Sequence, residues 1–230
     1  GQFVDWQDLM FSGTGYKTDH NVSINQSNGR NRNMLVLGYN KDQSIIDNMG
    51  YERFSARING DMELAKNLKV GYSSLLALTT RNTGDNSVWK YGTVIDPLTE
   101  VYDENGDMRF YNSGWYQTVL HSNPLFDTDK NNVDNKEKRT RILLNLFADW
   151  EIIKGLKFRT SLTYGLSSIE NGVYKSSTSQ ARQLASPSAE YKKTNEQQIT
   201  FTNVLNYKKV LNDHSLDVSL VHDMQTDKAE

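Results

Sequence analysis

Apolar residues occupy every second position on both sides of a short glycine-containing segment in the middle of the chain. The first run comprises Ile142, Leu144, Leu146, Ala148, Trp150 and Ile152, and the second comprises Leu156, Phe158, Thr160, Leu162, Tyr164 and Leu166. Alternation with a period of two is typical of a β-strand with one apolar face. Only Ile153, Lys154 and Gly155 separate the two runs, which fits a tight reversal with glycine available for a positive φ. The pattern predicts an antiparallel hairpin over residues 140–168.

The two arms of this hairpin are long for a soluble protein. Each spans about ten residues or more, whereas strands of soluble proteins usually have about five or six. A tilted strand needs about nine to eleven residues to cross a bilayer. The other face of the second arm is polar and carries Lys157, Arg159, Ser161 and Thr163. One apolar and one polar face are what a membrane barrel with an aqueous lumen requires.

Similar alternation predicts five further strands, and a continuous apolar run predicts a sixth. They lie at about 16–26, 34–40, 53–62, 68–79, 199–207 and 216–222. The stretch 34–40 is apolar on both faces, so the pattern does not indicate which face meets the core. The first fifteen residues mix aromatic side chains with glycine, which favours a short helix or turn packed against the rest.

The connections between these strands alternate in length: short, medium, short, very long, short, long, short. In an up-and-down barrel the odd-numbered connections share one side, and outer-membrane barrels have short periplasmic turns and long extracellular loops. A soluble sandwich has no reason to sort its connections in this way. We therefore predict an all-β, antiparallel up-and-down transmembrane β-barrel segment, about eight strands of a larger barrel. Residues 16–230 form it, with long extracellular loops at about 81–139 and 169–195.

Composition excludes several classes of protein. The 230 residues carry a formal net charge of −2 without a basic stripe, so there is no electrostatic footprint for nucleic acid. There is no cysteine, and no apolar run is long enough for a transmembrane helix. A mean hydropathy of −0.68 is compatible with a barrel, whose strands alternate and whose loops are polar. No export signal precedes the strands, and the chain stops at Glu230 without a closing aromatic strand, so we expect an excised piece.

Nothing in the sequence points to catalysis or to a cofactor. The four histidines (His20, His121, His214 and His222) share no metal-ligand spacing. No phosphate loop follows a strand, and no serine has a recognisable nucleophile setting. Asp127, Asp129, Asn131 and Asn135 have part of the spacing of a calcium loop, but Asn132 and Lys138 stand where glycine and a bidentate acid are expected. We expect a solvated polar turn there, and neither an enzyme nor a metal protein.

Several segments together resemble one family. They are the Trp-Gln-Asp start at Trp6, His-Asn-Val-Ser-Ile at 20–24, Leu-Gly-Tyr at 37–39, Arg-Phe-Ser-Ala-Arg-Ile-Asn at 53–59, Asn-Leu-Lys-Val-Gly at 67–71, the Pro…Val-Tyr-Asp-x-x-Gly segment at 97–106, and Asn-Pro-Leu-Phe at 123–126. In this order they resemble the start of the barrel in SusC/RagA-type TonB-linked outer-membrane proteins.

This resemblance implies an importer in the outer membrane of Bacteroidota. A 22-stranded barrel would hold a plug, a SusD-like lipoprotein would cover its outer side, and TonB would drive uptake of glycans or peptides. Residues 1–15 would be the lead-in segment from plug to barrel. The chain lacks the plug and the TonB-contacting box, so TonB would act through a part of the protein N-terminal to it, and outer-membrane lipid would surround the strands.

Two sets of residues are candidates for functional contacts. The very long connection carries aromatic side chains interleaved with polar ones, a mixture that suits a sugar, a peptide or a lipoprotein partner. They are Trp89, Tyr91, Tyr102, Phe110, Tyr111, Trp115 and Tyr116; the alternative is that they form a small core of the loop itself or an interfacial girdle. Arg53, Arg57 and Asp61 share the polar face of one strand, so we expect them to line the lumen.

Two other folds stay open from the sequence. One is a small closed eight-stranded outer-membrane barrel with a structural or adhesive role, which would require the strand near Val22 to pair with the strand near Val218. The other is a soluble glycan-binding β-sandwich, in which the apolar faces at Ile142 and Leu156 would meet a second sheet.

Overall fold

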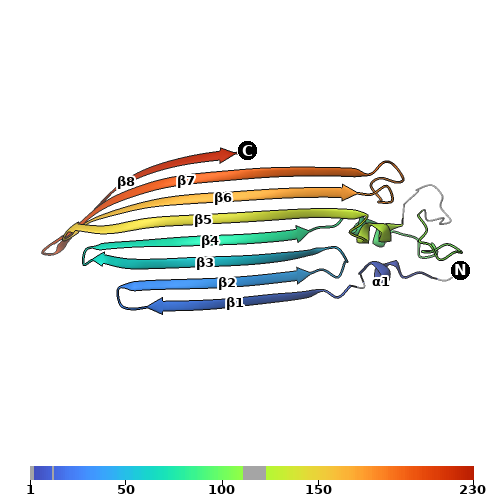
Figure 1. Cartoon of the computed structure of the whole chain (residues 1–230), viewed down its shortest axis with the longest axis horizontal. Helices are drawn as coiled ribbons and strands as arrows, with labels where there is room; N and C mark the ends of the chain where they lie inside the picture. Colours follow the sequence, from blue (N-terminus) through green and yellow to red (C-terminus); the bar gives the residue numbers. More distant parts are fainter. Residues whose placement is uncertain (1–2, 12, 111–122) are drawn as a thin grey trace.

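The computed structural model describes residues 3–11, 13–110 and 123–230 and contains one antiparallel sheet (Figure 1). The strands follow the order of the sequence, each pairing with the next. They are β1 (Tyr16–Ser27), β2 (Asn31–Gln43), β3 (Gly50–Ala65), β4 (Leu68–Asn82), β5 (Val133–Ile153), β6 (Leu156–Lys175), β7 (Ser188–Leu211) and β8 (His214–Ala229). Three short helices lie outside the sheet: α1 (Trp6–Phe11), α2 (Ser87–Gly92) and the 3-10 helix η1 (Pro124–Thr128).

The predicted central hairpin is confirmed as β5 and β6. Leu144 pairs with Tyr164 and Trp150 with Phe158, so the two apolar runs share one face of the sheet. On the other face, Asn145 donates a hydrogen bond to Thr163 across 2.7 Å. Gly155 has a φ of 86°, as the tight reversal requires.

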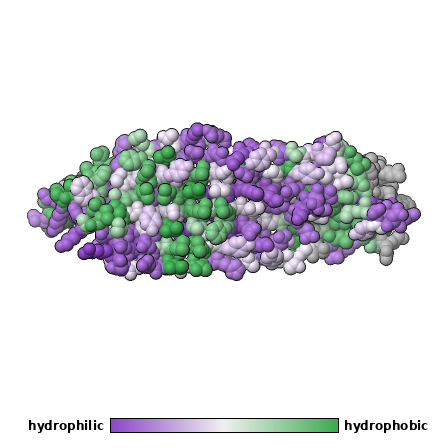
Figure 2. All heavy atoms as spheres, viewed as in Figure 1, coloured by the Kyte–Doolittle hydropathy of each residue, from purple (hydrophilic) through white to green (hydrophobic). Residues whose placement is uncertain are grey.

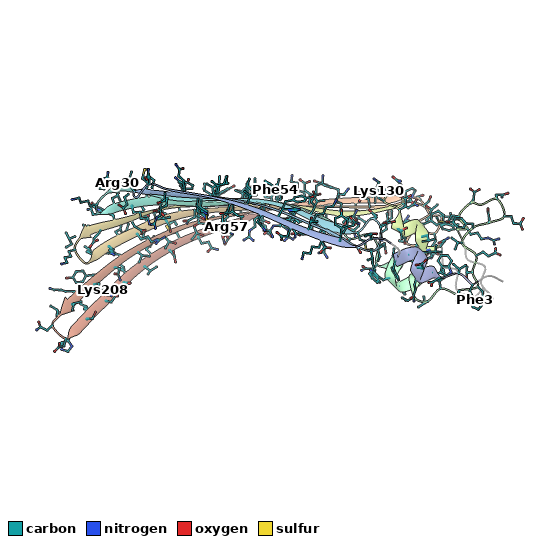
Figure 3. All side chains as sticks on the ribbon, turned by 90° about the horizontal axis from the view of Figure 1, so that it is seen from below. Phe3, Arg30, Phe54, Arg57, Lys130 and Lys208 are labelled. Atoms are coloured by element: carbon teal, nitrogen blue, oxygen red, sulfur yellow. The ribbon has the colours of Figure 1, made fainter. Side chains whose placement is uncertain are left out.

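The two faces of the sheet differ in both curvature and polarity. Figure 3 shows the sheet bending, with Phe54 on the convex side and Arg57 on the concave side. Register extends this division to every strand, because residues paired across strands share a face. It also settles the orientation of β2. Leu35 and Leu37 pair with Ile58 and Ala56, which are four and two positions from Phe54, so both leucines lie on the convex face.

The connections are sorted by length between the two ends of the sheet, as the sequence predicts. The short turns, at 28–30, 66–67, 154–155 and 212–213, lie at one end, and the longer connections, at 44–49, 83–132 and 176–187, lie at the other (Figure 1). The two long connections are shorter than the pattern indicates. β5 begins at Val133 and β6 continues to Lys175, because backbone pairing persists where the apolar alternation has ended.

The sheet is open, which rules out both alternative folds. Within the described residues β1 and β8 are the two edges and do not pair with each other, so the chain is not a small closed barrel. All eight strands belong to one sheet, so there is no second sheet against which the apolar face could pack as in a sandwich. The fold is one open, antiparallel up-and-down sheet of eight strands.

A small hydrophobic core lies outside the sheet, at the end with the long connections. Trp6 and Met10 of α1, Ile46 of the β2–β3 connection, and Val88 and Val101 of the β4–β5 connection are buried together. We call this cluster the loop core. α1 is the short helix expected near the start of the chain, and its packing joins residues 3–11 to the long connections. That the first fifteen residues lead in from a plug stays a prediction. No described helix is long and apolar enough to cross a membrane.

Candidate functional site

A hollow of about 650 Å³ opens where the concave face meets the long connections. We call it the loop-end hollow. Its wall includes Tyr51, Arg81, Asp85, Trp89, Asn135 and Lys175. These residues come from the ends of β3, β4, β5 and β6 and from the β4–β5 connection. The site therefore depends on strand ends that only the folded sheet brings together.

The loop core fixes the aromatic wall of this hollow. Trp89 is 48% exposed, although its neighbour Val88 in α2 is fully buried. The Trp89 ring stacks on Phe11 of α1, with 4.8 Å between the ring centroids. One flat side of the indole is held and the side chain keeps an accessible surface, which is the arrangement that favours stacking with a ligand.

Polar contacts tie the β2–β3 and β4–β5 connections to the ends of β4, β5 and β6. The Lys175 ammonium lies 2.7 Å from an Asp85 carboxylate oxygen, and both side chains are largely buried. The Asn48 amide donates to the Val133 carbonyl over 2.6 Å, and Asn82 donates to the Asn48 side-chain oxygen over 2.7 Å. These bonds link residues that are 34 to 90 positions apart in the chain. These long-range contacts fix the positions of the segments that surround the hollow.

The candidate aromatics of the long connection have different environments. Trp89 lines the loop-end hollow, and Tyr102 is exposed on a turn bridged to Met108. Tyr91 is half-buried in α2 with the Lys90 ammonium 5.2 Å from its ring centroid, while Phe110 packs against Phe126. Tyr111, Trp115 and Tyr116 lie outside the described residues.

Sequence reasoning missed several residues of the hollow. Tyr51, Arg81 and Lys175 have no unusual local context, since each is one position in an alternating strand. The one feature of the sequence that could have indicated them is that each lies near a longer connection, at the end of a strand. Register pairs Tyr51 with Arg81. Lys175 is not on this row, which reaches β6 at Asn171, and it joins the hollow from farther along β6.

The structure places Arg53, Arg57 and Asp61 on the concave face, as expected from their spacing. Asp61 lies 3.2 Å from both Arg32 and Lys69, so its charge is compensated. Arg53 and Arg57 are exposed and form no ion pair with any residue that the structure describes. The concave face thus presents two uncompensated cationic side chains near its centre.

The acidic segment at residue 127 is used structurally. Asp127 is buried and accepts a hydrogen bond from the Gln180 backbone amide at 3.0 Å, which ties the β4–β5 connection to the β6–β7 connection. The Asp129 side chain accepts from the Asn131 amide at 2.8 Å and forms a local turn. The described residues contain no cluster of three or more acidic or histidine side chains placed to hold a metal ion.

The chemistry available in the loop-end hollow is that of binding. An indole face, a phenol, a guanidinium and side-chain amides provide stacking and hydrogen bonds, which suit a polar ligand with flat or hydroxyl-rich surfaces. The hollow lies on the polar side of the sheet and is open toward the long connections.

Curated proteins similar to this chain are TonB-dependent receptors. No family model matches the chain. It is 24% identical over 223 residues to the TonB-dependent receptor P3 of Formosa agariphila, covering 94% of this chain and 22% of that protein. It is 30% identical over 118 residues to the TonB-dependent receptor SusC of Bacteroides thetaiotaomicron, covering 50% of this chain and 12% of that protein. The chain therefore spans about a fifth or less of the length of these relatives.

Solved structures share the fold. The structure of the RagAB peptide transporter matches with a TM-score of 0.76 at 16% identity, over 99% of this chain and 27% of that chain. The ferric-catecholate import receptor Fiu of E. coli K12 matches with a TM-score of 0.58 at 11% identity, over 93% of this chain and 32% of that chain. The curated relatives are named as receptors and the structural ones as a transporter and an import receptor. The curated relatives, the open eight-stranded sheet and its match to RagAB support the assignment of this chain as a fragment of a SusC/RagA-type TonB-dependent transporter.

Proposed function

We propose that this chain forms part of an outer-membrane importer that takes up glycans or peptides, coupled to TonB and assisted by a SusD-like lipoprotein. One observation carries the proposal: a sheet with an apolar convex face and a polar concave face bears a polar and aromatic hollow at the end where the long connections gather. Such a wall separates lipid from an aqueous passage and offers a binding site at the mouth of that passage.

The apolar zone of the convex face crosses the strands obliquely, as it does in a tilted membrane barrel. The paired row that starts at Ile24 of β1 reaches β8 at Thr226, whereas the apolar residues of β8 are centred at Leu220. A shift of six residues is about 20 Å along the strand, and seven strand spacings are about 34 Å across the sheet. The ratio gives a strand tilt of about 30°, near the 35–45° of membrane barrels.

Aromatic side chains lie at both margins of this zone. Tyr39 pairs with Phe54 toward the long connections, and Trp150 pairs with Phe158 toward the short turns. Aromatic girdles at the two membrane–water interfaces are typical of outer-membrane barrels. Figure 2 shows hydrophobic residues gathered over part of the strands, with hydrophilic residues on either side of them along the face in view.

The concave face supports the placement of the lumen on that side. Arg53 and Arg57 need a polar environment and have no anionic partner in the described chain, so we propose that they face the aqueous lumen and the plug of the complete transporter. A plug element with acidic side chains would compensate their charge.

The end with the long connections is the proposed site of substrate and lipoprotein contact. Trp89 and Arg81 would contact the substrate in the loop-end hollow. Leu98 of the β4–β5 connection and Leu184 of the β6–β7 connection are 46% and 57% exposed, and apolar side chains on an outward surface favour a protein partner. The SusD-like lipoprotein would cover this surface, and TonB would act on a part of the transporter that precedes this chain.

Uptake by the complete transporter tests the proposal. The Trp89→Ala variant removes the exposed stacking surface, and we expect the apparent affinity for the imported glycan or peptide to fall about tenfold, since aromatic stacking contributes about 1–1.5 kcal/mol. The measurement is uptake of a labelled substrate panel by cells with and without TonB, together with co-purification of the lipoprotein.

Val94→Ala is the matched control, because Val94 is exposed in the same connection and does not line the hollow. We expect it to leave uptake unchanged, and we expect both variants to retain the lipoprotein. Uptake that does not depend on TonB, or that Trp89→Ala and Val94→Ala alter equally, would contradict the proposed role.

A further inference from the structure

A second hollow, of about 300 Å³, lies on the opposite, convex face of the sheet. It is centred on Gly172 of β6, which pairs with Lys136 of β5 and Tyr191 of β7. A Cβ atom at Gly172 would meet no other atom within 4 Å, so the glycine leaves a vacant space between its neighbours. We call this site the convex hollow.

The walls of the convex hollow combine aromatic and charged groups. Tyr191 is 66% and Tyr174 38% exposed, and both lie on the same face as Gly172. Lys193 lies 2.8 Å from Glu170, and this hydrogen bond lowers the pKa of the Glu170 carboxyl and raises that of the Lys193 amine. The paired charges are fixed in place and can each still accept or donate further hydrogen bonds.

This combination favours a sugar over a simple anion. Exposed tyrosine rings present flat apolar surfaces, on which the C–H face of a pyranose can stack. The surrounding carboxylates and amines can bond hydroxyl groups. The lining carries three carboxylates and two ammonium groups: Asp134, Glu170, Glu190, Lys136 and Lys138. Lys136 lies 3.3 Å from Asp134, and Glu170 also pairs with Lys193 outside the lining. The carboxylates therefore offset the ammonium groups. A lone phosphate would gain little from them.

The distance of the convex hollow from the apolar zone limits which membrane lipids can contact it. The last apolar residue of the convex face on β6 is Leu166, and Gly172 lies six residues farther along the strand. Six residues of a strand tilted by about 30° rise about 17 Å. Each phospholipid headgroup layer is only about 5–8 Å thick. A phospholipid headgroup therefore ends below the convex hollow.

We propose that the convex hollow binds the oligosaccharide headgroup of a glycolipid in the surrounding outer leaflet. The inference rests on the outer-membrane placement proposed above. The hollow is continuous with the lipid-facing surface through the paired row at Glu170 and Lys193, and it opens sideways, away from the lumen. A glycan anchored in the leaflet reaches this position from below, at a high effective concentration.

Gly172→Leu is the decisive variant, because its Cβ meets no atom within 4 Å and the rest of its side chain occupies the convex hollow. Asn171→Leu is its matched control, since it adds the same side chain at the neighbouring position, where residues face the concave side. Tyr191→Ala removes one stacking surface. All three are made in the complete transporter purified with its lipoprotein.

The experiment measures the binding of two glycolipids by native mass spectrometry. The first carries a core oligosaccharide on its lipid A portion, and the second is the lipid A portion without that oligosaccharide. We expect the wild type and Asn171→Leu to bind the core-bearing form about tenfold more tightly. Gly172→Leu and Tyr191→Ala should lose this preference, which corresponds to about 1.4 kcal/mol of binding free energy. Substrate uptake should be equal in all four proteins.

Four outcomes would overturn the inference. Equal binding of both glycolipids by the wild type, with uptake intact, would show that the sugar makes no contact. A preference that survives in Gly172→Leu would place the glycan elsewhere. Free core oligosaccharide that binds as tightly as the glycolipid would assign the site to a soluble sugar. If glycolipid binding and TonB-dependent uptake are both absent from the wild type, the proposed function fails and the inference fails with it.

Discussion

Leu144 and Asn145 are adjacent residues with opposite surroundings. Leu144 lies on the convex face and is 37% exposed, and Asn145 bonds Thr163 on the concave face. Because this chain has no cysteine, single cysteines can be introduced at either position and labelled. In the complete transporter in membranes, we expect Leu144→Cys to react with a lipid-phase reagent only and Asn145→Cys with an aqueous reagent only. Protection of both positions from the lipid-phase reagent would show that the convex face packs against protein.

The alternation of single residues was enough to predict the faces of the sheet but could not predict the loop-end hollow. In β5 every second residue is apolar, so the sequence itself distinguishes Leu144 from Asn145. Tyr51 and Arg81 pair across β3 and β4, and Lys175 reaches the same hollow from the projecting end of β6, which no local pattern encodes. The stacking of Trp89 on Phe11 depends likewise on contact between segments 78 residues apart. The prediction of Trp89 as a contact residue used only its residue type and its place in a long connection.

At the scale of whole elements, the sequence located the strands but not all of their ends. β5, β6 and β7 continue past the apolar zone toward the long connections, where both faces are polar. Apolar alternation marks a strand only where one face is shielded from water. Backbone hydrogen bonds continue regardless, as the pairing of Val133 with Lys175 shows. The pattern therefore underestimates strands that project from a membrane.

Two turns at the short-turn end provide a matched test of how tightly the strands are held. Gly29 and Gly155 have almost the same φ, 84° and 86°. A Cβ at Gly29 would meet no atom within 4 Å, whereas a Cβ at Gly155 would collide with the Lys208 carbonyl oxygen of β7. The left-handed conformation alone costs a non-glycine residue about 1–2 kcal/mol. We expect Gly29→Ala to lower the free energy of unfolding by about this amount.

Gly155→Ala should lower the free energy of unfolding by at least about 1 kcal/mol more than Gly29→Ala does. The added methyl group would force β7 to shift, and the shift would strain the 2.7 Å hydrogen bond from the Lys208 amide to the Gly155 carbonyl. Urea unfolding of the complete barrel in detergent, followed by the mobility difference between folded and unfolded forms, measures both variants. Equal losses of unfolding free energy in the two variants would show that β7 does not clash with a side chain at position 155.

At the scale of the molecule, the surface area shows that this chain depends on its surroundings. Its accessible surface is 15,506 Å² for 26.3 kDa, whereas a compact monomer of this mass exposes about 10,600 Å². The excess is the two faces of an open sheet. Many large apolar residues of the convex face remain exposed, including Leu146 at 46%, Leu162 at 45% and Leu220 at 69%. Lipid would cover this face in a barrel, and the remaining strands would cover the edges.

The open edges decide how the 230 residues behave when they are produced alone. β1 and β8 each present an unpaired row of backbone groups, and β8 is exposed along its full length. Exposed edges beside an apolar face promote pairing between copies of a chain. We expect the separate chain to aggregate in plain buffer and to need detergent, as size-exclusion chromatography with light scattering would show. The complete barrel, which has no free edge, should give a single species in the same detergent. A monomer in plain buffer that unfolds cooperatively in urea would contradict the barrel assignment, because an open sheet with a lipid-facing side has no means of shielding that side from water.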